Sequence, residues 1–332
     1  MKVCLVTPLS RRGAWRKPEV GTGAIPLALG GDCFPYEAED YSPLDEYDVL
    51  ILHTAAALYD RVSHVLDLFP HKAKVLKLTC DAMFLDPQGF FPRWEVTLKS
   101  LLDRATLVLI ETADIGFFQA MTKTPVATWP HPVPVAALRQ HAVPRAQRRC
   151  PAMFYLGSAF RPKKNGLATA LAFRTIRERI APTATAIVFS PAQAAKEEAE
   201  AFARWGIEGV EVAESRGQDR LWPTVAQCEL GLHLDFRRSI GRFSVECAGL
   251  GIPCISTPGI FMQRALFPEI IVDPWDVEGA ASMAERLLRD PGFYDSVARR
   301  AAAELEHFDL EPMAARFWHL LRSAATPGCQ RE

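Results

Sequence analysis

The chain has 332 residues, of which 49% are hydrophobic and 23% are charged, and its formal net charge at pH 7 is -1. This length allows two domains that each bury a core, and this composition excludes a disordered chain. Division at residue 150 gives 17 Lys and Arg against 16 Asp and Glu before it, and 21 against 23 after it. Neither half is therefore a basic platform for nucleic acid.

The cysteines and the apolar runs limit where the protein works. The eight cysteines form no C-x-x-C pair, and several lie in apolar runs, which favours buried reduced thiols over disulfides or metal ligands. The chain starts with an expected strand, not a signal peptide. No apolar run reaches the roughly 18 residues that span a bilayer. A cytoplasmic location is expected, with peripheral membrane contact left open.

Short apolar runs alternate with longer amphipathic stretches in the first half of the chain. Runs that are buried on both faces suit parallel strands, and the stretches between them suit helices, so we expect an open α/β domain over 1–140. Polar and basic residues without periodicity indicate a linker at 139–149. The expected strands of this domain are 3–6, 49–52, 75–78, 107–110 and 126–129.

A second α/β series follows the linker, and we expect it to form a domain over 150–310, with a terminal helix in 311–325. Ligands of open α/β sheets bind at the carboxyl ends of the strands, so a cleft between two such domains is the expected site. Its expected strands are 152–156, 186–189, 210–212 and 231–234, with another from Pro253, and its expected helices are 165–180, 192–205, a short one from about Ser244, 279–289, 292–306 and 311–322.

The stretch 228–258 carries the most specific pattern in the chain. It predicts a strand, a basic glycine-bearing loop, a short helix and a second strand. Such a layout brings backbone N–H groups and a positive helix end to the mouth of a parallel sheet, where phosphates bind. Glu246 is expected in the first helical turn, where its carboxylate can accept two hydrogen bonds from neighbouring hydroxyls.

The run Phe243 to Thr257, FSVECAGLGIPCIST, resembles the donor-site signature of retaining GT-B glycosyltransferases of family 4, the group that contains sucrose synthase. The resemblance implies two Rossmann-like domains facing a central cleft, with the terminal helix crossing back to the first domain. It also implies that Glu246 holds the ribose of a nucleotide-sugar, and that the helix start around Phe243 and Ser244 cradles the diphosphate. The family has a second glutamate eight residues earlier, where this chain has Arg238, which we take as a catalytic candidate.

The segment after the linker supplies the other candidate phosphate ligands. A strand that ends in Gly157 is followed by Arg161, Lys163 and Lys164 before a helix. Arginine can bind a phosphate bidentately, and lysine acts as a point charge. The segment is similar to the family's glycine-arginine to lysine-asparagine motif, with Ser158 in place of the arginine that follows the glycine. The alternative is a solvated, lysine-rich helix start.

Candidates in the first half lie near strand ends. Asp81, after Cys80, would orient an acceptor hydroxyl or cap the following segment. His53 is a second catalytic candidate, and its alternative is a hydrogen-bonded scaffold residue. Basic residues of an early loop would meet an anionic acceptor or lie on the surface; they are Arg11, Arg12, Arg16 and Lys17.

The leading hypothesis is a transferase that moves a hexose or pentose from a UDP- or GDP-sugar to an acceptor hydroxyl on a glycan, a lipid-linked molecule or a small molecule. No H-x-x-x-H, C-x-x-C or D-x-D pattern is present, so we expect no metal site and no tightly bound cofactor. Three alternatives stay open: a non-catalytic nucleotide- or glycan-binding relative, a transferase that acts on modified DNA, and a sugar-nucleotide epimerase.

Overall fold

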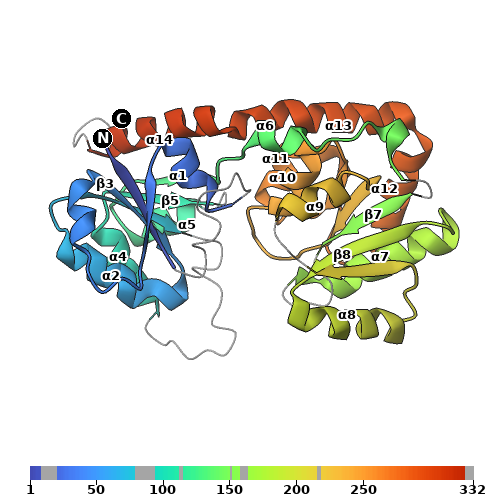
Figure 1. The fold of residues 1–332 in the computed structure, drawn as a ribbon, viewed down its shortest axis with the longest axis horizontal. Coiled ribbons are helices and arrows are strands. Elements are labelled where there is room, and N and C mark those ends of the chain that lie inside the picture. The colour runs from blue at the N-terminus through green and yellow to red at the C-terminus, as the bar shows by residue number, and fades with distance from the viewer. Residues whose placement is uncertain are drawn as a thin grey trace. The chain divides into compact units, whose positions relative to one another are not determined.

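The structure is a computed structural model, and its ribbon is shown in Figure 1. The chain divides into two compact units: unit 1 joins Met1–Pro134 to Phe308–Glu332, and unit 2 is Val135–His307. Each unit contains a parallel sheet flanked by helices. The residues described are 1–8, 21–78, 94–111, 115–149, 152–157, 164–214 and 218–325.

Unit 1 is built, within its described residues, on a six-stranded parallel sheet of order β2-β1-β3-β4-β5-β6. Because all strands run in the same direction, their carboxyl ends lie along one edge, and the register places His53 beside Lys77 there. The strands are β1 (Val3–Thr7), β2 (Asp32–Pro35), β3 (Val49–Thr54), β4 (Ala73–Leu78), β5 (Leu107–Ile110) and β6 (Val126–Thr128).

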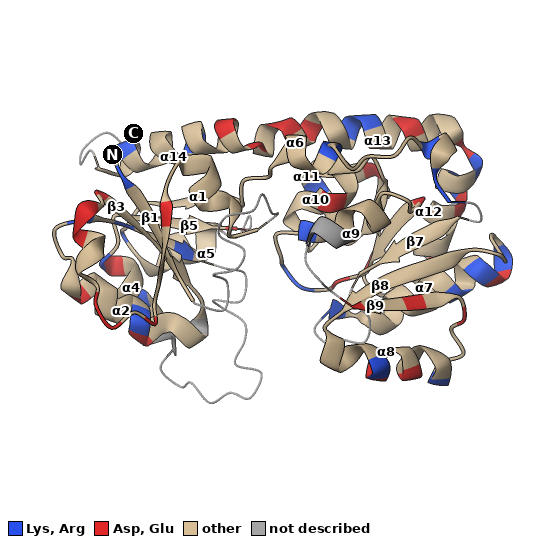
Figure 2. Cartoon of the chain, viewed as in Figure 1, with Lys and Arg blue, Asp and Glu red and all other residues tan. Residues whose placement is uncertain are grey.

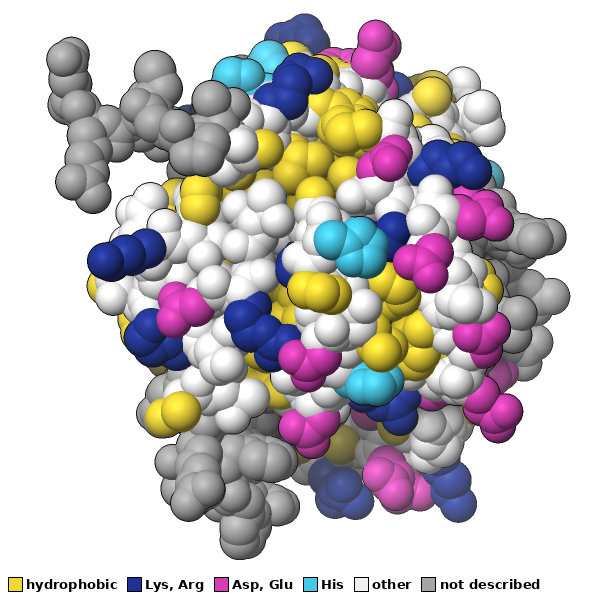
Figure 3. Space-filling view, turned by 90° about the vertical axis from the view of Figure 1, so that its left-hand side faces the viewer, with side chains coloured by type: hydrophobic (Ala, Val, Ile, Leu, Met, Phe, Trp, Pro, Cys, Tyr) yellow, Lys and Arg dark blue, Asp and Glu magenta, His cyan; other side chains and the backbone are white. Residues whose placement is uncertain are grey.

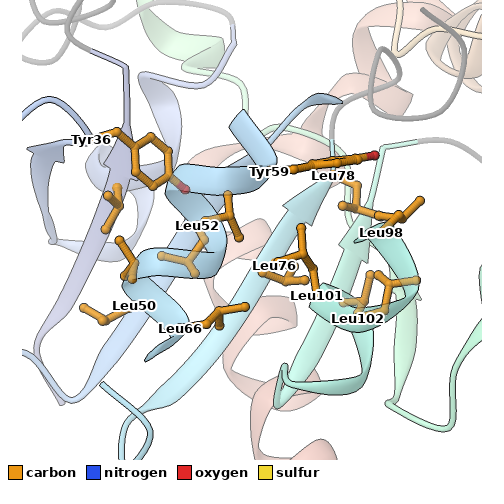
Figure 4. Close-up of a cluster of buried hydrophobic side chains, with 14 of the residues drawn as sticks. Tyr36, Leu50, Leu52, Tyr59, Leu66, Leu76, Leu78, Leu98, Leu101 and Leu102 are labelled. Carbon is orange, nitrogen blue, oxygen red and sulfur yellow. The ribbon is translucent and has the colours of Figure 1, made fainter. Parts of the chain in front are cut away.

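Alternate residues of these strands supply two cores, because successive side chains point to opposite faces of a sheet. Leu50 and Leu52 belong to one cluster and Ile51 to the other. Figure 4 shows leucines of β3, β4, α2 and α4 gathered in the first cluster. The helices of unit 1 are α1 (Ala24–Leu29), η2 (Ser42–Glu46), η3 (Ala56–Leu58), α2 (Tyr59–Leu68), α4 (Trp94–Asp103), α5 (Ile115–Met121) and α14 (Leu310–Ala325).

The C-terminal helix α14 belongs to unit 1, where it packs against α1 and β5. Phe317 is fully buried and lies 5.5 Å, centroid to centroid, from the ring of Trp129. The indole N–H of Trp129 also donates to the carbonyl of Met313 at 3.0 Å. The last helix of the chain is thus part of the core of the first sheet.

Unit 2 is built, over the part of it that is described, on a five-stranded parallel sheet of order β11-β10-β7-β8-β9. Helix α12 packs on α7, and α13 packs on α10 and α11. The strands are β7 (Met153–Leu156), β8 (Thr185–Ser190), β9 (Val210–Glu214), β10 (Leu230–His233) and β11 (Cys254–Ser256). The helices are α6 (Val135–Arg139), η4 (Arg145–Gln147), α7 (Gly166–Arg179), α8 (Ala192–Arg204), α9 (Gln218–Val225), α10 (Arg242–Gly249), α11 (Phe261–Leu266), η6 (Pro268–Ile270), α12 (Val277–Arg289) and α13 (Pro291–Leu305), with η7 (Glu306–Phe308) before α14.

The predicted class, two α/β units with parallel sheets, is confirmed. The sequence did not predict β2, α9 or α11. β2 is short and incompletely buried, and α9 contains Pro223, so neither shows a regular apolar pattern. No helix among the described residues has both the length and the apolar character that a bilayer span requires.

Candidate functional site

The carboxyl ends of β7 and β10 are the starting point of the candidate site in unit 2. These strands are neighbours, and the N–H of Gly157 donates to the carbonyl of Leu232 at 2.9 Å. A Cβ added to Gly157 would lie 2.2 Å from Cδ2 and 2.8 Å from Cβ of His233. Because the clash includes the Cβ of His233, no rotation of the imidazole relieves it. Only glycine therefore fits where the chain leaves β7.

His233 is a buried residue that sequence reasoning overlooked. Its side chain is 6% exposed, and Nε2 has no hydrogen-bond partner among the described residues. Oδ2 of Asp235 lies 3.7 Å from this nitrogen. Burial lowers the pKa of His233 to about 4; Asp235 opposes this shift, whereas Lys164 and Arg237 add to it. The imidazole is therefore neutral at pH 7.

Helix α10 supplies the second part of the site. It begins at Arg242, directly after Gly241, which adopts a left-handed conformation with φ 89°. The start is earlier than the predicted Ser244, so Glu246 lies in the second turn and not in the first. The amides at the start of a helix have no acceptor within it, which gives this end a positive potential.

Glu246 is buried, with 2% of its surface exposed. Oε2 accepts a hydrogen bond from the hydroxyl of Tyr155 at 3.4 Å, and Oε1 lies 3.7 Å from Nε of Arg242. Within the described chain, Oε1 has no hydrogen-bond partner. Burial raises the pKa of Glu246, and the charges of Arg242 and Lys164 oppose that shift.

Aromatic rings connect the two parts of the site. Phe243 stacks on Tyr155, with centroids 4.1 Å apart, and its ring lies 5.0 Å from that of His233. Lys164 stands just before α7, and its charge acts on both His233 and Glu246. The structure thus gathers Gly157, Lys164, Phe243 and Glu246, four of the residues that the sequence singled out.

Other sequence candidates of this unit are placed differently. The hydroxyl of Ser244 is buried and donates to Oε1 of Gln263 at 2.8 Å, so it is engaged within the core. Arg238 is exposed on the loop between β10 and α10. Arg161 and Lys163 lie outside the described residues, as does Asp81 of unit 1.

His53 is the penultimate residue of β3 in unit 1 and is also buried. Its Nδ1 lies 3.4 Å from the hydroxyl oxygen of Thr7, and its carbonyl accepts a hydrogen bond from Tyr36 at 3.1 Å. These are the contacts of a hydrogen-bonded scaffold residue, which was the alternative reading of His53.

A cluster of buried charged residues, which was not predicted from the sequence, lies at the same edge of the sheet. Nζ of Lys77 donates to the carbonyl of Trp129 at 2.9 Å and lies 3.4 Å from Oε1 of Glu111. Nε2 of His131 lies 2.7 Å from the same carboxylate oxygen. Burial by itself would raise the pKa of Glu111, but the charges of His131 and Lys77 outweigh it and hold that pKa well below its usual range.

Charges on the surface are mixed. Figure 2 shows acidic and basic residues interspersed along the described helices and strands. The face of the molecule in Figure 3 likewise carries both signs, with no large patch of one sign. The described residues on the face in Figure 3 form no broad basic patch of the kind that binds nucleic acid.

No protein-family model matches the chain, and no curated protein matches it by sequence. Solved structures do match it over almost its full length. Sucrose-phosphate synthase from Thermosynechococcus elongatus is 13% identical, with a TM-score of 0.74, over 97% of this chain and 98% of that one. A UDP-forming α,α-trehalose-phosphate synthase from Burkholderia xenovorans is 12% identical, with a TM-score of 0.71, over 98% and 99%.

A third similar structure is Anabaena HepE in complex with UDP and glucose. It is 16% identical, with a TM-score of 0.72, over 97% of this chain and 100% of that one. At such identities the likeness establishes the fold alone. Together with the two parallel sheets, it shows that the chain has the GT-B fold predicted from its sequence.

Proposed function

We propose that the protein is a glycosyltransferase that moves a sugar from a nucleoside diphosphate-sugar to an acceptor hydroxyl. The observation that carries this proposal is the arrangement of Lys164, the start of α10 and Glu246 around the carboxyl ends of β7 and β10. A positive helix end and a lysine suit a diphosphate. A buried carboxylate with one oxygen that accepts no hydrogen bond from the described residues suits a pair of ribose hydroxyls.

The names of the similar structures support the same reading. One is a sucrose-phosphate synthase, one is a UDP-forming trehalose-phosphate synthase, and HepE holds UDP and glucose. UDP is therefore the first nucleotide to test, ahead of GDP, and glucose is the first sugar. A small carbohydrate is the first acceptor class, ahead of a glycan or a lipid-linked molecule.

The roles in the reaction follow from charge and position. Lys164 and the first amides of α10 would neutralise the leaving diphosphate, joined by Arg161 and Lys163, which precede Lys164 in the sequence. Glu246 would fix the ribose, and the exposed guanidinium of Arg238 would face the departing group. Stabilisation of a leaving anion by fixed cations and amides needs no metal ion, and it supplies much of the catalysis in such transfers.

The acceptor side belongs to unit 1 in this proposal. Asp81 would orient the acceptor hydroxyl. His53 would serve as a scaffold residue on this side, because its hydrogen bond to Thr7 holds the imidazole near the carboxyl end of β3. Retention of the anomeric configuration is part of the proposal through the sequence resemblance to family 4.

Nucleotide binding is the direct test. UDP at about one hundred times its Kd raises the free energy of unfolding by roughly 2.7 kcal/mol, which thermal denaturation detects. Glu246→Ala should remove the UDP-dependent rise while the free protein stays folded. Glu208→Gln, at a carboxylate whose side chain is 85% exposed in the same unit, should leave it intact. An unchanged response of Glu246→Ala would refute the ribose assignment.

Turnover separates a transferase from a non-catalytic relative. Release of UDP from UDP-glucose that requires an added sugar acceptor supports transfer. Binding of UDP without release of product from any nucleotide-sugar and acceptor tested would support the non-catalytic alternative.

A further inference from the structure

We propose that His233 is a further ligand of the donor diphosphate, to which it donates a hydrogen bond from Nε2. The inference rests on the proposed function, because it adds one residue to the same nucleotide site. It also assigns a role to a side chain that lies outside the run Phe243 to Thr257, which resembles the donor-site signature.

His233 lies between the chain that leaves β7 and the start of α10, the two elements that suit a phosphate. It is the last residue of β10. The chain leaving β7 passes directly over its ring, since the position of a Cβ on Gly157 would overlap Cδ2 of the imidazole. On another side lies Phe243, the second residue of α10, with its ring 5.0 Å away. A phosphate held by the start of α10 would therefore lie close to the imidazole.

The hydrogen bonding of His233 is incomplete in the described structure. Its Nε2 is buried and has no hydrogen-bond partner there. The Oδ2 atom of Asp235 is 3.7 Å from Nε2, too far for a hydrogen bond. It already accepts a hydrogen bond from Arg237 at 3.1 Å. Buried polar atoms without partners are uncommon in folded proteins, and one at a ligand site is explained by the ligand.

The charges around the ring favour an anion as the missing partner. Lys164 and Arg237 both act on the imidazole, and Asp235 supplies the opposing negative charge. Because its pKa is about 4, the ring is neutral at pH 7 and carries one N–H. A neutral donor held in place beside a lysine can bind a phosphate oxygen without bringing another buried charge into the site.

A matched pair of substitutions tests the role of Nε2. His233→Gln keeps an N–H donor at about the reach of Nε2, whereas His233→Leu has a similar size and no donor. Leucine leaves no buried polar atom unpaired, so the Leu variant should fold, and its thermal stability without ligand is measured first. His307→Asn, at an exposed histidine of the same unit, is the control.

Calorimetric titrations with UDP, inorganic pyrophosphate and uridine separate the parts of the ligand. We expect His233→Leu to weaken UDP and pyrophosphate by about tenfold or more, the value of one strong hydrogen bond to a charged group. We expect His233→Gln to stay within a few-fold of the wild-type protein, and uridine to bind all forms alike.

The outcomes distinguish a failure of the proposed role of His233 from a failure of the proposed nucleotide-sugar function. Unchanged UDP affinity in His233→Leu, or equal weakening of UDP and uridine, would overturn the role of His233 while leaving the nucleotide site in place. Failure of the wild-type protein to bind UDP, GDP, ADP or pyrophosphate would overturn the proposed function and this inference with it.

Discussion

Lys77 and Glu111 form an ion pair that is closed off from solvent, with side chains 1% and 3% exposed and Nζ 3.4 Å from Oε1. The pair lies at the carboxyl edge of the first sheet, where Glu111 directly follows β5. Two charges removed from water are stable there because each faces the other, because Lys77 also donates to the carbonyl of Trp129, and because His131 lies 2.7 Å from the same oxygen of Glu111. The pair makes unit 1 sensitive to the loss of either charge.

Glu111→Gln removes the negative charge while keeping the shape of the side chain. We expect the free energy of unfolding to fall by about 3–5 kcal/mol, because the Lys77 ammonium loses its carboxylate partner in a buried site. Urea denaturation followed by circular dichroism measures the loss. Lys99→Gln, which breaks the exposed pair with Asp103 in the same unit, should cost less than about 1 kcal/mol. A cost of that small size for Glu111→Gln would contradict the prediction.

Gly157→Ala tests the close approach of β7 to His233. A methyl group at this position would lie 2.2 Å from the imidazole, so the neighbours must shift, at a cost of about 1–3 kcal/mol in stability. UDP binding should weaken as well, because the same shift moves His233. Gly116→Ala is the control. Gly116 lies in helix α5, and a Cβ there would meet no atom of the described residues within 4 Å. That control should be neutral or stabilising by up to about 1 kcal/mol.

Glu246→Gln should raise stability and lower UDP affinity. Because burial raises the pKa of Glu246 above its usual 4.5, the folded state holds this proton more tightly than the unfolded state does. The charged carboxylate therefore costs stability above the raised pKa, and this cost disappears as the pH falls through it. We expect the gain in Tm for Glu246→Gln to be larger at about pH 8 than at about pH 5.

The matching measurement for Glu246 is UDP affinity across the same pH range. Ribose hydroxyls need the charged carboxylate as acceptor. As the pH is lowered, the UDP affinity of the wild-type protein should therefore begin to fall at a higher pH than it would if Glu246 had the pKa of an ordinary glutamate. In Glu246→Gln this component should be absent. A Tm gain that does not depend on pH would show that Glu246 is not titrating from a raised pKa.

Phe317→Ala tests the packing of α14 in unit 1. Phe317 is fully buried against Trp129, so its removal should cost about 3–5 kcal/mol in the free energy of unfolding. Phe117 is 49% exposed, and Phe117→Ala should change stability by less than about 0.5 kcal/mol. Equal effects of the two substitutions would mean that α14 does not stabilise the sheet of unit 1.

Much of the fold could be predicted from the sequence, because the strands of a parallel sheet that is buried on both faces are continuous apolar runs. The runs around β3, β4 and β5 are of this kind, and the structure has strands at each. The short strand β2 was not predicted, because it has no continuous apolar run. β2 begins with an exposed aspartate and ends in proline. The boundary between the units also differs from the prediction, because unit 2 begins at Val135, which the sequence analysis placed in the first domain.

Part of the candidate site in unit 2 was predictable from local sequence. Gly157, Lys164, Phe243 and Glu246 each stand beside a strand end or a helix start, and such positions can be read from the order of apolar runs, glycines and charges. Three contacts depended on the tertiary structure alone: Gly157 over His233, Lys77 with Glu111, and Ser244 with Gln263. A side chain's partner, burial and pKa depend on residues far away along the chain, so only the folded arrangement decides them.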